Sequence, residues 1–311
     1  MSGIDAVRLN FSPTTLHALN AILGIVMFGV ALDLRSEDFR RVVANPRPVL
    51  IGLAGHYVVF PAFTFLLVLA IKPPPSVALG MMLVASCPAG NISNFLVHLA
   101  RGNTALSVSI SSTSTVLSVV ATPLVLRFWG SMYAPTRAIM RAVAVDPVDM
   151  FVTIFLLLGL PLAAGMFVQR RWPAFTDRVR APMKRLSIGI FAAFLVVALA
   201  ANWQYFVKYV GRVVVAVVLH NATALTVGYW TAAVFGLPVR DRRAVSFEVG
   251  IQNSGLGLIL IFTFFGGLGG AAIVAAWWGI WHIVAGLSLA TFWSRRPLPD
   301  LGPLNPVNGQ P

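Results

Sequence analysis

Apolar residues lie in long runs, and short stretches rich in Pro, Arg and Lys separate these runs. A helix needs about 20 mainly apolar residues to cross a bilayer. Nine stretches reach this length: residues 15–35, 48–71, 76–100, 103–129, 148–168, 186–206, 212–235, 242–266 and 269–293. The pattern predicts an all-α polytopic membrane protein, with nine transmembrane helices in one domain, residues 15–293. Residues 1–14 precede the first span, and the Pro- and Gly-rich residues 294–311 predict a disordered tail.

Two of the nine predicted spans carry polar and helix-breaking residues at mid-depth, from Cys87 to Asn94 and from Glu248 to Gly255. Backbone groups freed by such breaks are costly in hydrocarbon unless they line a cavity. Spans one to four, about residues 15–129, can be laid on spans six to nine, within a second half of about residues 148–293. The two breaks then correspond, and the two halves have opposite orientations. Paired breaks in an inverted repeat indicate the binding site of a transporter.

Composition and charge narrow the class further. The chain has 311 residues, of which 58% are hydrophobic and 11% charged, whereas soluble domains carry about 25% charged residues. The net charge of +13 does not indicate a nucleic-acid partner, because the charges lie in short loops between spans. One set of loops holds sixteen of the 23 Lys and Arg residues, and the opposite set holds seven. This bias predicts an inner-membrane protein with its N-terminus outside and its C-terminus in the cytoplasm.

The sequence offers little support for an enzyme. Cys87 is the single cysteine, so no internal disulfide can form. The five histidines form neither a His-x-x-x-His pair nor a cluster with the cysteine, which argues against a transition-metal site. No nucleotide-binding loop or nucleophile elbow is present, so an ATP-driven pump is not indicated.

Glu248 is the only carboxylate deep inside a predicted span, and such an acid marks a functional site by default. The alternative is a neutral glutamic acid bonded to a neighbouring helix. The fourth span is rich in hydroxyl groups, and Ser107, Ser111, Ser114 and Ser118 share one helix face. Alone, this face favours close helix packing. Beside two broken helices it favours a binding role.

Oxygen-bearing side chains near the breaks suit a hard cation. Sodium requires several oxygen ligands, and Ser93, Asn94, Ser107, Ser111 and Glu248 can supply them. The N-termini of the half-helices at the breaks direct N–H groups and positive dipole ends towards the cavity, which favours an anionic substrate. A cation site beside an anion site predicts transport of a small organic anion coupled to sodium.

Six short motifs follow one another along the chain. They are Met27 to Leu32 with Asp38-Phe39, Cys87 to Gly90 with Ser93-Asn94, Ala100 to Asn103 with Ala105-Leu106-Ser107, Leu219-His220-Asn221, Glu248 to Leu256, and Trp281-His282 with Gly286. In this order they resemble the bile acid:sodium symporter family, from about Leu23 to Trp293. The resemblance implies a core domain with two crossing broken helices and a panel domain that includes spans one, five and six. It places the substrate in the crevice between these domains.

The resemblance also implies two sodium sites. The first comprises Ser93, Asn94, Ser107, Ser111 and Glu248. The second comprises Glu248, Gln252, the carbonyls of Val249 and Ile251, and His56, which stands where glutamine is usual. The substrate crevice is expected at Gly90, Asn91, Asn253, His282 and Ile283. Ile283 replaces the usual asparagine, and Asn91 replaces a small residue, so the substrate need not be a bile acid. The resemblance implies import of a small organic anion of bile-acid, keto-acid or pantoate-like type.

His56 leaves alternatives open. An imidazole nitrogen is a poor ligand for sodium, so we expect the second site to be weak or absent and transport to fall as the histidine is protonated. Alternatively, His56 bonds a neighbouring helix and a second sodium binds without it. A proton-coupled or pH-sensitive organic-anion carrier on the same fold is the second interpretation. A receptor or channel-like protein without coupled transport is the third.

Overall fold

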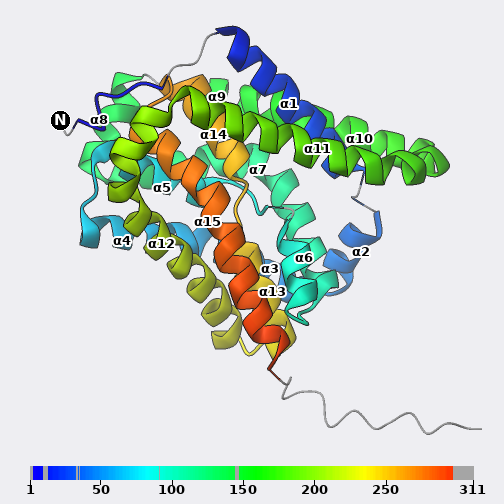
Figure 1. Cartoon of the computed structure of the whole chain (residues 1–311). Helices are drawn as coiled ribbons and strands as arrows, with labels where there is room; N and C mark the ends of the chain where they lie inside the picture. Colours follow the sequence, from blue (N-terminus) through cyan, green and yellow to red (C-terminus); the bar gives the residue numbers. More distant parts are fainter. Residues whose placement is uncertain are drawn as a thin grey trace, which may run out of the picture.

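The computed structural model describes residues 3–9, 13–32, 34, 36–90, 92–143 and 147–296 (Figure 1). Within these residues the chain is helical, apart from two isolated β-bridges. The helices are α1 (Pro13–Ala31), α2 (Ser36–Ala44), α3 (Pro46–Ala54), α4 (Phe60–Ile71), α5 (Pro75–Ser86), α6 (Ile92–Leu99), α7 (Thr104–Met132), α8 (Ala134–Ala142), α9 (Pro147–Ile154), α10 (Leu160–Arg171), α11 (Pro173–Ala201), α12 (Trp203–Val234), α13 (Val239–Gly250), α14 (Ser254–Phe265) and α15 (Gly269–Ser294). The predicted all-α class is confirmed.

Five helical stretches in the described part are long and apolar enough to cross a membrane. They are Pro46–Ile71, Thr104–Met132, Val148–Arg171, Val213–Val234 and Gly269–Ser294. The predicted spans 76–100 and 242–266 are each divided in two, because α5 ends at Ser86 before α6 begins, and α13 ends at Gly250 before α14 begins. The chain is therefore a multi-pass membrane protein, and a non-helical break divides each of these two predicted spans.

Two wide π turns interrupt the first and third of these long stretches. One covers Gly55–Val59, between α3 and α4, and the other covers Phe155–Gly159, between α9 and α10. A proline follows each turn at the second residue, Pro61 and Pro161. Proline has no N–H to donate to the preceding turn, and local π adjustments re-satisfy the backbone groups that proline frees in membrane helices.

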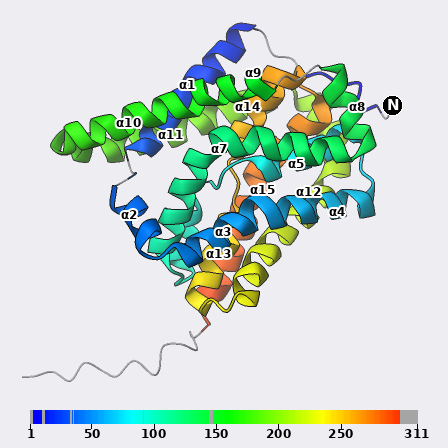
Figure 2. The same cartoon turned by 180° about the vertical axis from the view of Figure 1, so that it is seen from behind.

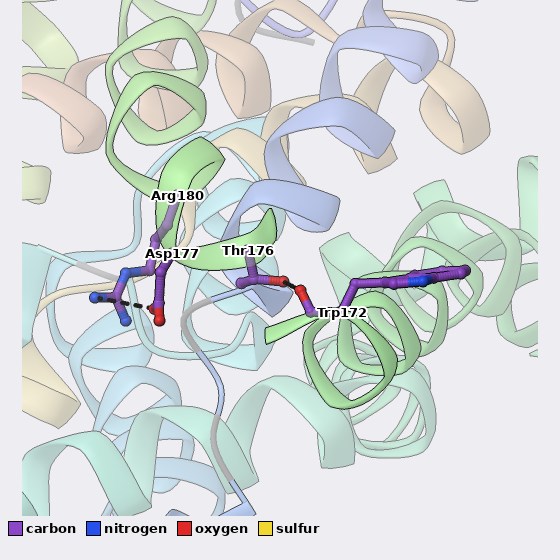
Figure 3. A network of polar contacts seen from close by, with 4 residues as sticks. All are labelled: Trp172, Thr176, Asp177 and Arg180. Atoms are coloured by element: carbon purple, nitrogen blue, oxygen red, sulfur yellow. Dashed lines mark hydrogen bonds and ion pairs between the residues drawn. The ribbon is translucent and has the colours of Figure 1, made fainter. Parts of the chain in front are cut away.

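Helices α1, α10 and α11 pack beside one another along one side of the molecule (Figures 1 and 2). Ala31, Leu34 and Leu162 form a small apolar cluster at this packing. Gly165 allows the close approach, because a Cβ there would lie 2.5 Å from the Cβ of Ala31. At the turn into α11, Thr176 donates both its N–H and its hydroxyl to the carbonyl of Trp172, at 3.0 and 3.1 Å (Figure 3).

Some boundaries differ from those predicted. The predicted loop at residues 207–211 lies inside α12, and the turn between α11 and α12 falls at Asn202. Lys and Arg in this region are good helix formers, so they do not end a helix as Pro and Gly do. The short helices α2 and α8 were not predicted, since each has only nine residues. The predicted disorder of the tail from residue 297 onwards lies outside the described residues.

Residues 3–9, here the N-terminal segment, are fastened to distant parts of the chain. Leu9 N–H donates to the carbonyl of Gly267 at 3.0 Å, and Gly269 N–H donates to that of Val7 at 2.9 Å. The Asp5 carboxylate accepts from the N–H of Ser76 at 2.9 Å. Helix α5 begins at Pro74-Pro75, which offers no side-chain acceptor, so Asp5 caps it from outside.

Candidate functional site

The two breaks meet in the interior, and backbone groups of one form hydrogen bonds with backbone groups of the other. Gly90 N–H donates to the carbonyl of Ile251, and Asn253 N–H donates to that of Pro88, both at 2.8 Å. Ala89 and Gln252 form an isolated β-bridge between these two bonds. The bonds explain how non-helical backbone persists at membrane depth, because each break supplies partners that lipid cannot provide.

Neighbouring side chains complete this support. Asn221 of α12 donates to the carbonyl of Gly250 at 2.7 Å. The Ser114 hydroxyl of α7 accepts from the N–H of Ala89 at 3.2 Å. Tyr57, in the first π turn, donates to the carbonyl of Ser114 at 2.8 Å. Three helices outside the breaks therefore hold the breaks in place.

The Glu248 carboxylate lies close to the meeting point and is fully buried. Its Oε1 accepts hydrogen bonds from the hydroxyls of Ser93, at 2.6 Å, and Ser107, at 2.5 Å. Its Oε2 is buried and has no hydrogen-bond partner. No ion pair joins Glu248 to a basic side chain in the part of the chain that the structure describes. A buried carboxylate without a counter-charge is costly, so this position suits a bound cation.

The other predicted first-site residues continue the same oxygen cluster. The Ser107 hydroxyl also lies 2.7 Å from Asn94 Oδ1, and its single proton is donated at any one time either to this oxygen or to Glu248 Oε1. The Ser111 hydroxyl lies 3.4 Å from Asn94 Oδ1 and accepts from Asn94 Nδ2 at 3.2 Å. Ser93, Ser107 and Ser111 are buried. Five oxygen-bearing side chains from α6, α7 and α13 thus converge, and their hard oxygen donors fit sodium.

The predicted second site is assembled differently. His56 is fully buried, with Nε2 2.8 Å from the carbonyl of Cys87 and Nδ1 3.0 Å from that of Glu248. The carbonyl of Val249 accepts from Gln252 Nε2 at 2.7 Å, and that of Ile251 accepts from Gly90. The structure brings these residues together, but protein donors occupy the carbonyls expected to bind an ion. Gln252 Oε1 stays buried without a partner.

The predicted substrate residues form a less compact group than the residues of the predicted first sodium site. Asn253 caps α14, because its side chain accepts from the N–H of Leu256 at 3.1 Å. His282 is buried and its Nδ1 has no partner, whereas Ile283 is half-buried. Helix α15 passes close to the start of α14, since a Cβ at Gly279 would lie 2.8 Å from the Ser254 hydroxyl. Asn91 lies outside the described residues.

Sequence reasoning missed the supporting roles of three side chains. Asn221 belongs to a recognised motif and Ser114 to the hydroxyl face of the fourth span. The sequence therefore singled out both residues, but it did not predict their hydrogen-bond partners. Tyr57 carried no such signal, because a lone tyrosine in an apolar span has no periodicity or spacing that indicates its partner. Only the meeting of α7 with the first π turn reveals its bond to Ser114.

Comparisons with known proteins agree with this geometry. The model of the Sodium Bile acid symporter family matches residues 21–209. The chain belongs to this family. It is therefore a sodium-dependent membrane transporter and not an enzyme.

Relatives of this symporter occur in bacteria, plants and animals. The sodium-dependent transporter YocS of Bacillus subtilis is 31% identical over 278 residues, which cover 89% of this chain and 83% of YocS. The probable chloroplastic sodium/metabolite cotransporter BASS2 of Oryza sativa is 28% identical over 89% of this chain and 64% of its own length. The ileal sodium/bile acid cotransporter of Homo sapiens is 26% identical over 76% of this chain and 67% of its own.

Proposed function

We propose that this symporter imports a small organic anion together with sodium by alternating access. The observation that carries the proposal is the Glu248 carboxylate, which is fully buried, holds one oxygen without a partner, and is surrounded by neutral oxygen donors. A cation balances this charge, and family membership makes sodium the ion to expect.

In this proposal sodium is held by Ser93, Asn94, Ser107, Ser111 and Glu248. Hydroxyl and amide oxygens replace the water around the ion, and the carboxylate neutralises its charge. Because these side chains come from α6, α7 and α13, ion binding draws three elements together beside the meeting of the two breaks. The free energy of sodium binding can then contribute to ordering the neighbouring substrate crevice.

The substrate is proposed to lie beside the breaks, near Gly90, Asn253, His282 and Ile283. The start of α14 lies there, and a helix N-terminus favours a carboxylate. The partly exposed Ile283 presents an apolar surface where an amide was expected. An anion of bile-acid, keto-acid or pantoate-like type, with a carboxylate and an apolar body, suits such surroundings.

The proposed architecture has nine spans in an inverted repeat, a core domain built around the two breaks, and a panel domain that includes α1, α10 and α11. Support comes from the contact between the two breaks and from the separate packing of α1, α10 and α11. The distribution of Arg and Lys supports an inner-membrane location, with the N-terminus outside and the C-terminus in the cytoplasm.

Uptake by purified protein in proteoliposomes tests the proposal. A panel of radiolabelled keto acids, pantoate and bile acids is offered with an inward sodium gradient, and the same panel is offered with potassium in its place. We expect at least one anion to accumulate only with sodium, and sodium ionophores to abolish its accumulation. Accumulation that is equal in sodium and potassium would reject sodium coupling.

A proton-coupled or pH-sensitive carrier is a second candidate, and His56 favours it. Both ring nitrogens face carbonyl oxygens, but a neutral imidazole has only one N–H to donate. The second carbonyl is satisfied only when the ring carries a second proton. Three residues with titratable side chains adjoin the ring: Cys87 and Glu248, whose backbone carbonyls face it, and Tyr57, whose ring lies edge-on at 4.6 Å. Uptake driven by a proton gradient without sodium would support this candidate.

A further inference from the structure

One end of the molecule carries a dense group of arginines that the transport site does not use. Six of them, here the arginine cluster, come from the start of α3, the α6–α7 loop, the α12–α13 region and the end of α15. They are Arg47, Arg101, Arg240, Arg242, Arg295 and Arg296. All are exposed except Arg242, which is half-buried.

Hydrogen bonds between these segments show that the cluster is continuous. Arg47 donates to the carbonyl of Phe235, at the end of α12, at 2.9 Å. The carbonyl of Arg240 accepts from the N–H of Asn103 at 3.0 Å. The buried Arg243 donates to the carbonyls of Ala100, at 2.7 Å, and Trp293, at 3.2 Å. The ends of α12, α13 and α15 meet in Figure 1 accordingly.

Among the described residues, Asp241 is the one acidic side chain placed within this cluster, and it forms no ion pair with the six arginines. It is buried and accepts from Asn103 Nδ2 at 2.8 Å. None of the six arginines forms an ion pair in the part of the chain that the structure describes. By contrast, Arg180 pairs with Asp177 at 4.0 Å beside the α10–α11 turn (Figure 3). The cluster is therefore open to an external anion.

Exposed aromatic rings place the cluster at the edge of the bilayer. Trp230, Phe235 and Phe292 lie at the same end of the molecule and are 60%, 54% and 51% exposed. Arg296 lies over the ring of Phe292, 4.8 Å from its centroid. Aromatic rings gather at the level of lipid headgroups, and cationic loops favour the cytoplasmic leaflet with its anionic lipids. The guanidinium groups can contact the phosphate of a lipid headgroup, and the apolar rings beside them can contact the acyl chains of the lipid.

We propose that the arginine cluster binds the phosphate of an anionic phospholipid. Arginine binds phosphate through two parallel hydrogen bonds, and several guanidinium groups from separate segments surround the headgroup. The bound lipid links the ends of α12, α13 and α15. Since α13 also carries Glu248, the lipid stabilises the helix that holds the transport site.

Lipid binding by the full-length protein tests this proposal. The protein in detergent is titrated with phosphatidylglycerol or phosphatidylcholine, and bound lipid is counted by native mass spectrometry while thermal stability is recorded. The test variant is Arg240→Gln/Arg295→Gln/Arg296→Gln. The matched control, Arg170→Gln/Arg171→Gln/Arg178→Gln, removes three exposed arginines from the α10–α11 region.

We expect phosphatidylglycerol, and not phosphatidylcholine, to be retained and to raise the melting temperature of the wild-type protein and of the control. The test variant should bind it on the order of 100-fold more weakly, at about 1 kcal/mol for each removed charge. If both triple variants lost binding equally, or if inorganic phosphate stabilised the protein as well as the lipid does, the proposal would be overturned. Should the test variant not fold, Arg295→Gln alone must retain less lipid than Arg178→Gln.

Discussion

At the scale of single residues, Glu248 is distinguished by its surroundings and not by its type alone. Ser93 and Ser107 donate to one carboxylate oxygen, and the other has no partner. The sequence sufficed to find this acid, because a charge in the middle of an apolar span is rare. Its partners were also expected, through the breaks and the hydroxyl face. The cap formed by Asn253 and the bond from Asn221 to Gly250 were not, because they depend on contacts between distant segments.

Glu248→Gln should strongly weaken sodium binding with little change of fold. The amide keeps the size of the side chain but removes the charge, and interactions with a charged group contribute about 1.5–3 kcal/mol. Sodium affinity should fall by roughly 10- to 100-fold in isothermal titration. Asp149→Asn is the control, because Asp149 is exposed at the start of a span. Equal sodium affinity in both variants would remove Glu248 from the site.

Asn94→Ala and Ser107→Ala should each weaken sodium affinity about tenfold, since each removes one oxygen that compensates for the lost hydration of the ion. Isothermal titration measures the effect. Ser118→Ala provides the control on α7, because the Ser118 hydroxyl is bonded to the carbonyl of Thr115 and takes no part in the oxygen cluster. If the first two variants bound sodium as the control does, the site would have to lie elsewhere.

His56→Gln should make sodium binding more cooperative. In the wild-type protein the imidazole fills the space between the carbonyls of Cys87 and Glu248, so we expect a sodium Hill coefficient near one. Glutamine offers an oxygen in its place. Sodium-binding stoichiometry and the Hill coefficient, measured on the same preparations, check the effect. A wild-type coefficient near two that His56→Gln leaves unchanged would show that a second ion binds without help from this position.

At the scale of helices, the sequence predicted the breaks inside two spans more reliably than the residues at which other helices begin and end. Pro and Gly stand together with polar residues at both breaks, so the divisions between α5 and α6 and between α13 and α14 could be read from the sequence, whereas the lone Pro123 and Pro182 lie inside α7 and α11. The boundary at Asn202 could not, because no proline or glycine lies there and Lys208 continues the helix. Nor could the short α2 and α8, whose nine residues each resemble a polar loop.

Asn221→Ala should destabilise the break at Gly250. The substitution leaves a buried carbonyl without its donor, which costs about 1–3 kcal/mol, and the melting temperature should fall by several degrees. Thr223→Ala is the matched control on α12, because Thr223 is only half-buried and its hydroxyl bonds the carbonyl of Leu219 in its own helix. The two proteins are compared in the same detergent. Equal melting temperatures would mean that the break does not depend on α12.

At the scale of the whole molecule, the meeting of the two breaks was expected from the family resemblance, which implies two crossing broken helices. The packing of α1 with α10 and α11 followed only from resemblance, because it depends on small residues such as Gly165 and Ala31 that have no sequence pattern of their own. The attachment of the N-terminal segment was not foreseen. Two of its contacts join residues more than 250 positions apart, and Val7, Leu9, Gly267 and Gly269 contribute only backbone atoms to them.

That attachment has a consequence for how the protein is made. The N-terminal segment is translated before most of the spans, whereas Gly267 and Gly269, to which it bonds, are translated after nearly all of them. The segment must therefore stay without these bonds, on the outer face proposed above, until α14 and α15 have been translated and inserted. Chains stalled during translation at residue 240 should leave the segment open to an added protease, whereas completed chains should protect it.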